Sequence, residues 1–159
     1  MPLVRNGWRI FYHPIFGERY EELRTEVRRL KKELPPEQFI EHRTAKLLKW
    51  VHTQITEVVP ANPNARDFWL KGELKVFRRA HLPRRYRLFW VFSERHKVII
   101  FLYLNDESTL RKAGAKTDPY DVFKQMLARG EIGKDYDANV QDWLQQHGAK
   151  VLPESHTAE

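Results

Sequence analysis

The chain has 159 residues, of which 42% are hydrophobic and 13% aromatic, enough for one compact domain with a core and too many for a disordered chain. It contains no cysteine, which excludes disulfides, thiolate metal sites and thiol catalysis and favours a reducing cytoplasm. The formal net charge is +7. The positive charge is concentrated in one segment with a single acid, Glu73, among Lys71, Lys75, Arg78, Arg79, Arg84, Arg85 and Arg87. Such a patch favours a nucleic-acid partner, and the alternative is a role in solubility.

The first predicted elements are a strand and two helices. Aromatic and β-branched residues predict a strand over residues 8–13, which Pro14 ends. Apolar residues then recur at spacings of three and four between Phe16 and Leu34, which predicts an amphipathic helix. Pro35 and Pro36 end it, and a second helix is predicted over about residues 37–59. Together the two helices should form a hairpin.

Three strands are predicted next, over residues 74–79, 85–93 and 97–105. The polar residues 94–96 fit the turn of an antiparallel hairpin between the last two. Both of these strands are apolar on both faces, which is typical of the centre of a covered sheet. The longest apolar run, residues 98–104, is too short to cross a bilayer, and the first residues do not resemble a signal peptide. We therefore expect a cytoplasmic protein without a membrane partner.

The last part of the chain carries clear helix signals. Asp118 suits an N-cap, Pro119 suits the first helical position, and Gly130 suits the end of the helix. We also expect one helical turn at residues 109–111 and a short helix over residues 138–147. The predicted fold class is α+β: a curved antiparallel sheet covered by the N-terminal helical hairpin, with a C-terminal helix. Residues 1–148 should form a single domain, and residues 149–159 a flexible tail.

Several cationic residues are predicted to converge on one strand pair. Residues two apart on a strand share a face, so Arg85 and Arg87 should point the same way and could clamp a phosphate. Arg78, Arg79 and His81 lie on or beside the preceding strand and would approach Arg87 if the strands pair. The structural alternative is that these arginines are charges on the surface at the strand end.

His81 is the best candidate for an acid or base near neutral pH, although a lone histidine is more often an exposed loop residue. Lys116 and Tyr120 are four residues apart at the start of the last helix. Tyr120 could stack on a base or position a hydroxyl proton, or could simply pack in the first helical turn. Asn105, Asp106 and Glu107 end a central strand, where a structural role is favoured. Because no metal-ligand or phosphate-loop motif is present, we expect chemistry without metal or cofactor.

Short motifs follow one another along the chain: Asn6-Gly7-Trp8, His13-Pro14, Arg85-Tyr86-Arg87-Leu88-Phe89, and over residues 105–127 the pattern NDE-x-TLR-x-x-G-x-KTD-x-Y-x-VF-x-x-ML. At family level, this ordered set resembles the YhaV toxins of the RelE-like superfamily. The corresponding strand of that family reads RYRLFF, and the pattern over residues 105–127 is close to the family's own. The resemblance covers about residues 6–130. Trp90 stands in place of the second Phe of RYRLFF.

The resemblance implies a toxin of a type II toxin–antitoxin pair that cleaves messenger RNA on the ribosome and so inhibits translation and growth. It also implies a cognate antitoxin of the PrlF/AbrB-like kind. Carried over by position, the catalytic residues are Arg79, His81, Arg87, Lys116 and Tyr120, and His81 replaces a lysine of the relatives. The remaining cations that we expect to bind RNA are Lys71, Lys75, Arg78, Arg84, Arg85 and Arg111.

Two other functions are compatible with the same sequence. RelE-like folds include gyrase inhibitors of the ParE type, which lack the nuclease residues, and fold alone does not separate the two. A non-catalytic RNA- or ribosome-binding module would explain the charge equally well, and would bind with strong salt dependence but form no product. The combination of Arg79, Arg87 and Tyr120 favours the nuclease.

Overall fold

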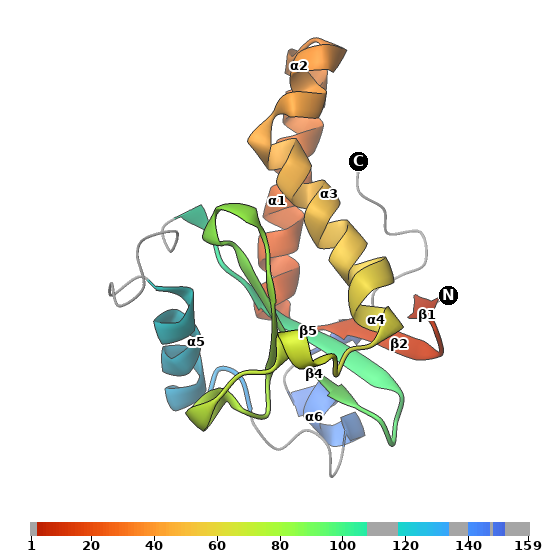
Figure 1. Cartoon of the computed structure of the whole chain (residues 1–159), viewed down its shortest axis with the longest axis vertical. Helices are drawn as coiled ribbons and strands as arrows, with labels where there is room; N and C mark the ends of the chain where they lie inside the picture. Colours follow the sequence, from red (N-terminus) through yellow and green to blue (C-terminus); the bar gives the residue numbers. More distant parts are fainter. Residues whose placement is uncertain (1–2, 108–117, 134–139, 147, 152–159) are drawn as a thin grey trace.

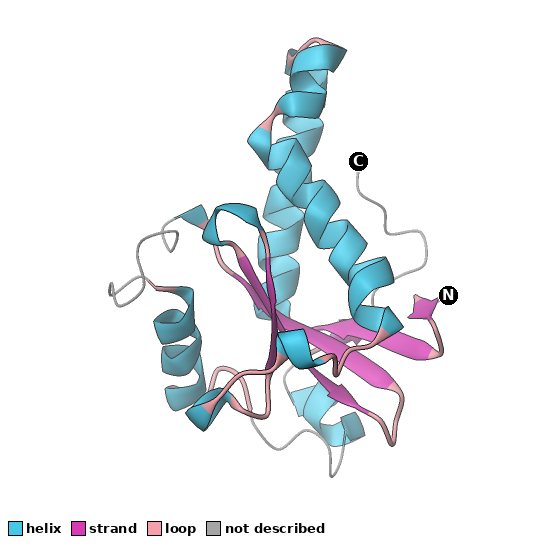
Figure 2. Cartoon of the chain, in the orientation of Figure 1, coloured by secondary structure: helices cyan, strands magenta, loops and turns pink. Residues whose placement is uncertain are grey.

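In a computed structural model of the whole chain, the structure describes residues 3–107, 118–133, 140–146 and 148–151. One twisted sheet separates a long helical hairpin from two shorter helices (Figures 1 and 2). Each face of the sheet carries its own cluster of buried apolar side chains. The chain is therefore α+β, as predicted. The predicted helical turn at 109–111, and with it Arg111 and Lys116, falls outside the described residues.

The sheet is mixed, so the prediction of an antiparallel sheet is wrong at one strand pair. Its order is β1 (Val4–Arg5), β2 (Trp8–Tyr12), β5 (Val98–Leu104), β4 (Arg87–Ser93) and β3 (Arg78–His81), and β6 (Lys150–Val151) also pairs with β2. β2 runs parallel to β5, while β3, β4 and β5 are antiparallel neighbours. A parallel pair needs a long connection, and here the chain passes through the helical hairpin, β3 and β4 between β2 and β5.

Three predicted boundaries also differ from the structure. The third strand was predicted over residues 74–79, but Gly72–Leu74 forms a 3-10 turn and β3 begins at Arg78. The fourth was predicted from Arg85, whereas β4 begins at Arg87 after a second 3-10 turn, Pro83–Arg85. The predicted tail includes β6, which pairs antiparallel with β2. None of the helices in the described ranges is long and apolar enough to span a membrane.

The helical hairpin begins with α1 (Pro14–Glu33), and its buried face is the predicted one, Phe16, Tyr20, Leu23, Val27 and Leu30. The second helix is not continuous as predicted. It consists of α2 (Pro36–Glu41), α3 (Arg43–Thr53), a π-helical turn (Gln54–Val58) and α4 (Val59–Ala61). The break is at His42, whose backbone is extended and whose ring Nδ1 accepts from the Thr44 N–H at 3.1 Å. His42 thereby acts as the N-cap of α3.

The opposite face of the sheet carries α5 (Pro119–Ala128) and α6 (Val140–Gln146), which confirms both predicted C-terminal helices. As predicted, Asp118 caps α5, accepting from the Tyr120 N–H at 2.8 Å. The Phe123 ring of α5 stacks on Phe89 of β4 at 4.5 Å between centroids. A register shift at Phe89 and Trp90 places consecutive residues of β5, Leu102 and Tyr103, in the cluster on this face. These contacts fix the start of α5 beside the β3–β4 pair.

Candidate active site on the β3–β4 pair

The β3–β4 pair brings three of the predicted catalytic residues onto one face of the sheet. Arg79 lies opposite Phe89, and His81 lies opposite Arg87. Directly opposed residues share a face, as do residues two apart on one strand. Because Phe89 belongs to the apolar cluster under α5, the side chains of Arg79, His81 and Arg87 lie on the α5 side of the sheet. The predicted convergence with Arg87 is therefore confirmed for Arg79 and His81, but not for Arg78.

Tyr120 joins this group from the first turn of α5. Its hydroxyl oxygen lies 3.5 Å from Nε2 of His81, and the direction of this hydrogen bond depends on the histidine tautomer. The Tyr120 ring packs edge-on against Phe89 at 5.6 Å between centroids. The Arg79 guanidinium lies 5.9 Å from the centre of the same ring, within range of a cation–π interaction. The structure thus places the tyrosine among the cationic residues and in contact with the histidine.

Hydrogen bonds from the backbone N–H of Arg87 and from one nitrogen of its guanidinium fix the position of this residue. Nη1 donates to the carbonyl oxygens of Leu82, at 3.2 Å, and Tyr86, at 2.8 Å. The backbone N–H of Arg87 donates to Oδ1 of Asn105 at 2.6 Å, and the Asn105 amide donates to the Arg85 carbonyl at 3.2 Å. Asn105 is fully buried. Asn105 therefore orients Arg87. The sequence predicted a structural role for the end of β5, but not this contact with Arg87.

Arg79 and Arg87 retain donors with no partner. Nε of each is buried and has no hydrogen bond within the described part of the chain. Toward the residues that the structure describes, Arg79 donates only from Nη1, to the Asp67 carbonyl at 3.3 Å. A buried donor without an acceptor is costly, so two of them on neighbouring strands call for a ligand rich in acceptor atoms. The non-bridging oxygens of a phosphodiester are such acceptors, and guanidinium groups bind them with charge-assisted bonds.

The environment of His81 favours the neutral ring. Partial desolvation is the largest cause, and the positive charges of Arg79 and Arg87 add to it, so that the pKa of His81 is lowered from its ordinary value. A neutral imidazole at neutral pH can accept a proton. The arrangement therefore combines a proton acceptor, a hydroxyl group in contact with it, and two guanidinium groups that can stabilise developing negative charge.

The other predicted cations take different positions. Arg84 and Arg85 are in the turn before β4 with positive φ values of 62° and 67°, so Arg85 does not share a strand face with Arg87. That prediction is wrong because neither residue is glycine and nothing local indicates a left-handed backbone. Lys71 and Lys75 are exposed. Arg78 faces away from the site and donates to Asn64, with its guanidinium 5.7 Å from the centre of the Trp69 ring.

Within the described ranges, no group of three or more His, Asp or Glu side chains could hold a metal ion. The proton-transfer and charge-stabilising groups described above come from side chains of β3, β4 and α5 alone.

Comparison with known proteins identifies relatives over most of the chain. Residues 10–143 match a family model described as a toxin with endonuclease activity, of a toxin–antitoxin system, Toxin_YhaV. Toxin YhaV of Escherichia coli O6:H1 (strain CFT073) is 40% identical over 148 residues, which cover 89% of this chain and 96% of that protein. Ribonuclease toxin YhaV of Escherichia coli K12 is 39% identical over the same shares of the two chains. No solved structure matches the chain.

Proposed function

Since the chain belongs to the YhaV family of toxins with endonuclease activity, we propose that it cleaves messenger RNA on the ribosome as the toxin of a type II toxin–antitoxin pair. The observation that carries this proposal is the cluster formed by Arg79, His81, Arg87 and Tyr120. It unites groups for proton transfer with buried guanidinium donors that lack acceptors in the described part of the chain. The curated relative from strain K12 is named a ribonuclease toxin, which supports RNA as the substrate.

The proposed reaction uses the 2′-hydroxyl of the RNA as nucleophile and needs no metal ion. Neutral His81 accepts the 2′-hydroxyl proton while the 2′-oxygen attacks the adjacent phosphorus. The bond from phosphorus to the 5′-oxygen breaks, leaving a 2′,3′-cyclic phosphate and a 5′-hydroxyl. Arg79 and Arg87 stabilise the negative charge on the phosphoryl oxygens. The departing 5′-oxygen takes its proton from Tyr120 or from Lys116, the late lysine predicted by the family pattern.

The ribosome supplies what this site lacks. A site built from arginines, one histidine and one tyrosine is open and has modest bases, so its rate depends on a substrate held in line for attack. The ribosome holds messenger RNA in a fixed path. Four exposed cations would meet the RNA backbone: Lys71 and Lys75, which precede β3, and Arg84 and Arg85, in the turn between β3 and β4.

The proposal includes the wider setting of such a toxin. We propose that the chain belongs to the RelE-like superfamily. Two features support this: the helical hairpin that covers one face of the sheet, and the basic β3–β4 pair with the tyrosine of α5 beside it. We assign it to the cytoplasm, where messenger RNA is translated. The toxin–antitoxin description of the family implies an antitoxin, and we propose one of the PrlF/AbrB-like kind that covers the site or displaces α5.

The test adds the purified chain to a cell-free translation reaction and maps messenger RNA ends by primer extension, with and without ribosomes. Cuts only in translated messages are the expected result. Cuts in RNA without ribosomes would support the nuclease activity but contradict the proposed requirement for the ribosome. A folded chain that makes no cuts would replace the proposal with gyrase inhibition or non-catalytic RNA binding, which DNA supercoiling and filter-binding assays separate.

A further inference from the structure

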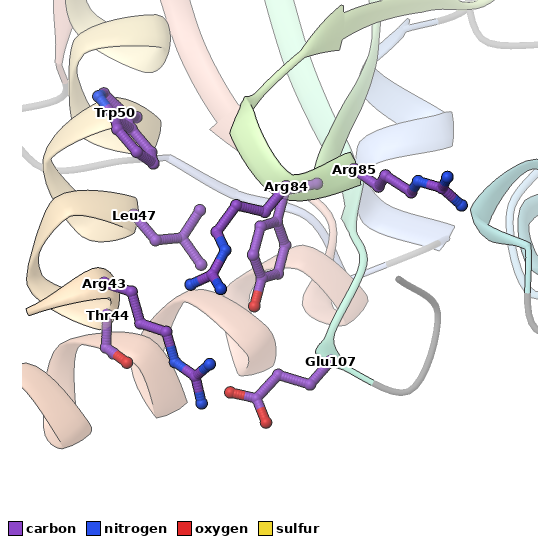
Figure 3. A pocket seen from close by; sticks show the side chains of 8 residues that line it. Arg43, Thr44, Leu47, Trp50, Arg84, Arg85 and Glu107 are labelled. Atoms are coloured by element: carbon purple, nitrogen blue, oxygen red, sulfur yellow. The ribbon is translucent and has the colours of Figure 1, made fainter. Parts of the chain in front are cut away.

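A second cationic site lies on the other side of the turn between β3 and β4. A cavity of about 350 Å³ opens between this turn, the N-terminus of α3 and the end of β5. Figure 3 shows Arg43, Arg84 and Glu107 extending toward one another at this cavity, while Arg85 points away from them. Tyr86, which lines the cavity, belongs to the apolar cluster under the helical hairpin. The cavity therefore lies on the hairpin side of the turn, whereas the His81 ring contacts Tyr120 of α5.

Among the residues that the structure describes, the two arginines of this cavity have no anionic partner. Within the described part of the chain, the side chains of Arg43 and Arg84 make no hydrogen bond or ion pair, and Glu107 pairs with neither. Arg43 is the first residue of α3, where the helix dipole disfavours a cation. Arg84 has a left-handed backbone, which is unfavourable for a residue with a side chain. An anion bound between them would offset these unfavourable placements.

The cavity also has an apolar wall. Leu47 and Tyr86 are buried beside it, and Trp50 is half-buried. Burial raises the pKa of Tyr86, and the charges of Arg19, Glu107, Arg43 and Arg84 act on the same hydroxyl. Flat apolar groups beside cations suit a ligand that has both a planar ring and a phosphate. The volume is in the range of small-molecule sites, whose lower limit is about 300 Å³.

We propose that this cavity binds one unpaired nucleotide of the RNA substrate, away from the bond that is cut. Its phosphate lies between Arg43 and Arg84, and its base lies against Trp50 and Leu47. The Glu107 carboxylate, which would repel a bare anion, accepts a hydrogen bond from the ribose or base. This inference rests on the proposed nuclease function and assigns the chain a subsite that fixes which nucleotides lie near the scissile phosphate.

Binding is tested first without any cleavage. The full chain, labelled with ¹⁵N, is titrated with each of the four nucleoside monophosphates, with inorganic phosphate and with an acidic peptide. Arg43→Gln and Arg84→Gln should each weaken nucleotide binding about tenfold or more, because each removes a charge-assisted contact. Arg95→Gln, in the exposed turn between β4 and β5, removes the same charge far from the cavity and should leave binding unchanged. Both cavity arginines are exposed, so these variants should fold.

The outcomes separate this inference from the function on which it rests. Inorganic phosphate or the acidic peptide binding as tightly as the nucleotides would overturn the nucleotide assignment, as would equal weakening by Arg95→Gln. In the cleavage assay, the cavity variants should raise KM and leave kcat nearly unchanged. Cleavage with unchanged KM in both variants would refute the subsite while leaving the nuclease intact. Nucleotide binding at the cavity without cleavage would refute the nuclease alone.

Discussion

Asn105 and Arg87 are joined through the backbone: the side-chain oxygen of Asn105, at the end of β5, accepts from the Arg87 N–H at 2.6 Å. The amide of Asn105 donates in turn to the carbonyl of Arg85, so one buried side chain fixes the chain on both sides of Tyr86. The start of β4, and with it the direction of the Arg87 guanidinium, depends on this contact.

Replacing Asn105 by alanine should therefore impair both stability and cleavage. The substitution leaves the Arg87 N–H and the Arg85 carbonyl without partners and should cost about 1–3 kcal/mol in the free energy of unfolding. Urea denaturation measures the stability, and cleavage is compared under conditions where both proteins are folded. An Asn105→Ala protein with unchanged stability and activity would show that the contact does not hold the site.

The parts of the fold set by local chemistry could be predicted from the sequence. The cap of α5 follows from Asp118 and Pro119, and the buried face of α1 follows from its spacing. The parallel pairing of β2 with β5 could not be predicted, because it depends on contacts between segments far apart in the chain. Nor could the break at His42, since histidine is an uncommon N-cap.

The candidate site divides in the same way. The approach of Arg79 and His81 to Arg87 was predicted on the condition that the two strands pair, but the register that sets His81 opposite Arg87 was not predicted. The left-handed backbone at Arg84 and Arg85 was not, because glycine or asparagine usually marks this conformation. Asn105 was expected at a strand end, but its contact with Arg87 depends on the register of β4 against β5. The position of Arg43 beside the β3–β4 turn was missed because the hairpin brings it there from a distant part of the chain.

The lowered pKa of His81 predicts a particular dependence of cleavage on pH. A general base acts when it is neutral, so cleavage should be constant at neutral pH and fall as the solution is acidified through the His81 pKa, below the ordinary value of about 6.5. His81→Gln should slow cleavage by about 10²- to 10⁴-fold and abolish this acidic limb. Rates are measured under single-turnover conditions across the pH range. Persistence of the same limb in His81→Gln would assign the titration to another group.

Tyr120 can be tested by removing only its hydroxyl group. Tyr120→Phe keeps the ring that packs on Phe89 and lies beside Arg79, but removes the contact with His81. The free energy of unfolding of the variant should lie within about 0.5 kcal/mol of that of the parent protein. Its cleavage should nevertheless fall by about tenfold or more, because a group that positions or supplies a proton is lost. Full activity in Tyr120→Phe would restrict this residue to packing.

The turn before β4 offers a stability prediction of the opposite sign. Arg85→Gly relieves a left-handed conformation with φ of 67° and should raise the free energy of unfolding by about 1 kcal/mol. Arg95 lies in a turn and has no positive φ, so Arg95→Gly should lower the free energy of unfolding, because glycine there only adds conformational freedom to the unfolded chain. Thermal and urea unfolding of the two variants compare the effects. Destabilisation by Arg85→Gly would mean that its side chain stabilises the fold.

The central claim is that the guanidinium of Arg87 acts on the scissile phosphate, and Arg87→Ala in a translating extract tests it most directly. Primer extension is run on one message with the parent chain, Arg87→Ala and Arg95→Ala at equal concentrations of folded protein. We expect the cuts to fall by about 10²-fold or more in Arg87→Ala and to persist in Arg95→Ala. Normal cutting by folded Arg87→Ala would contradict the assignment of the active site to the β3–β4 pair.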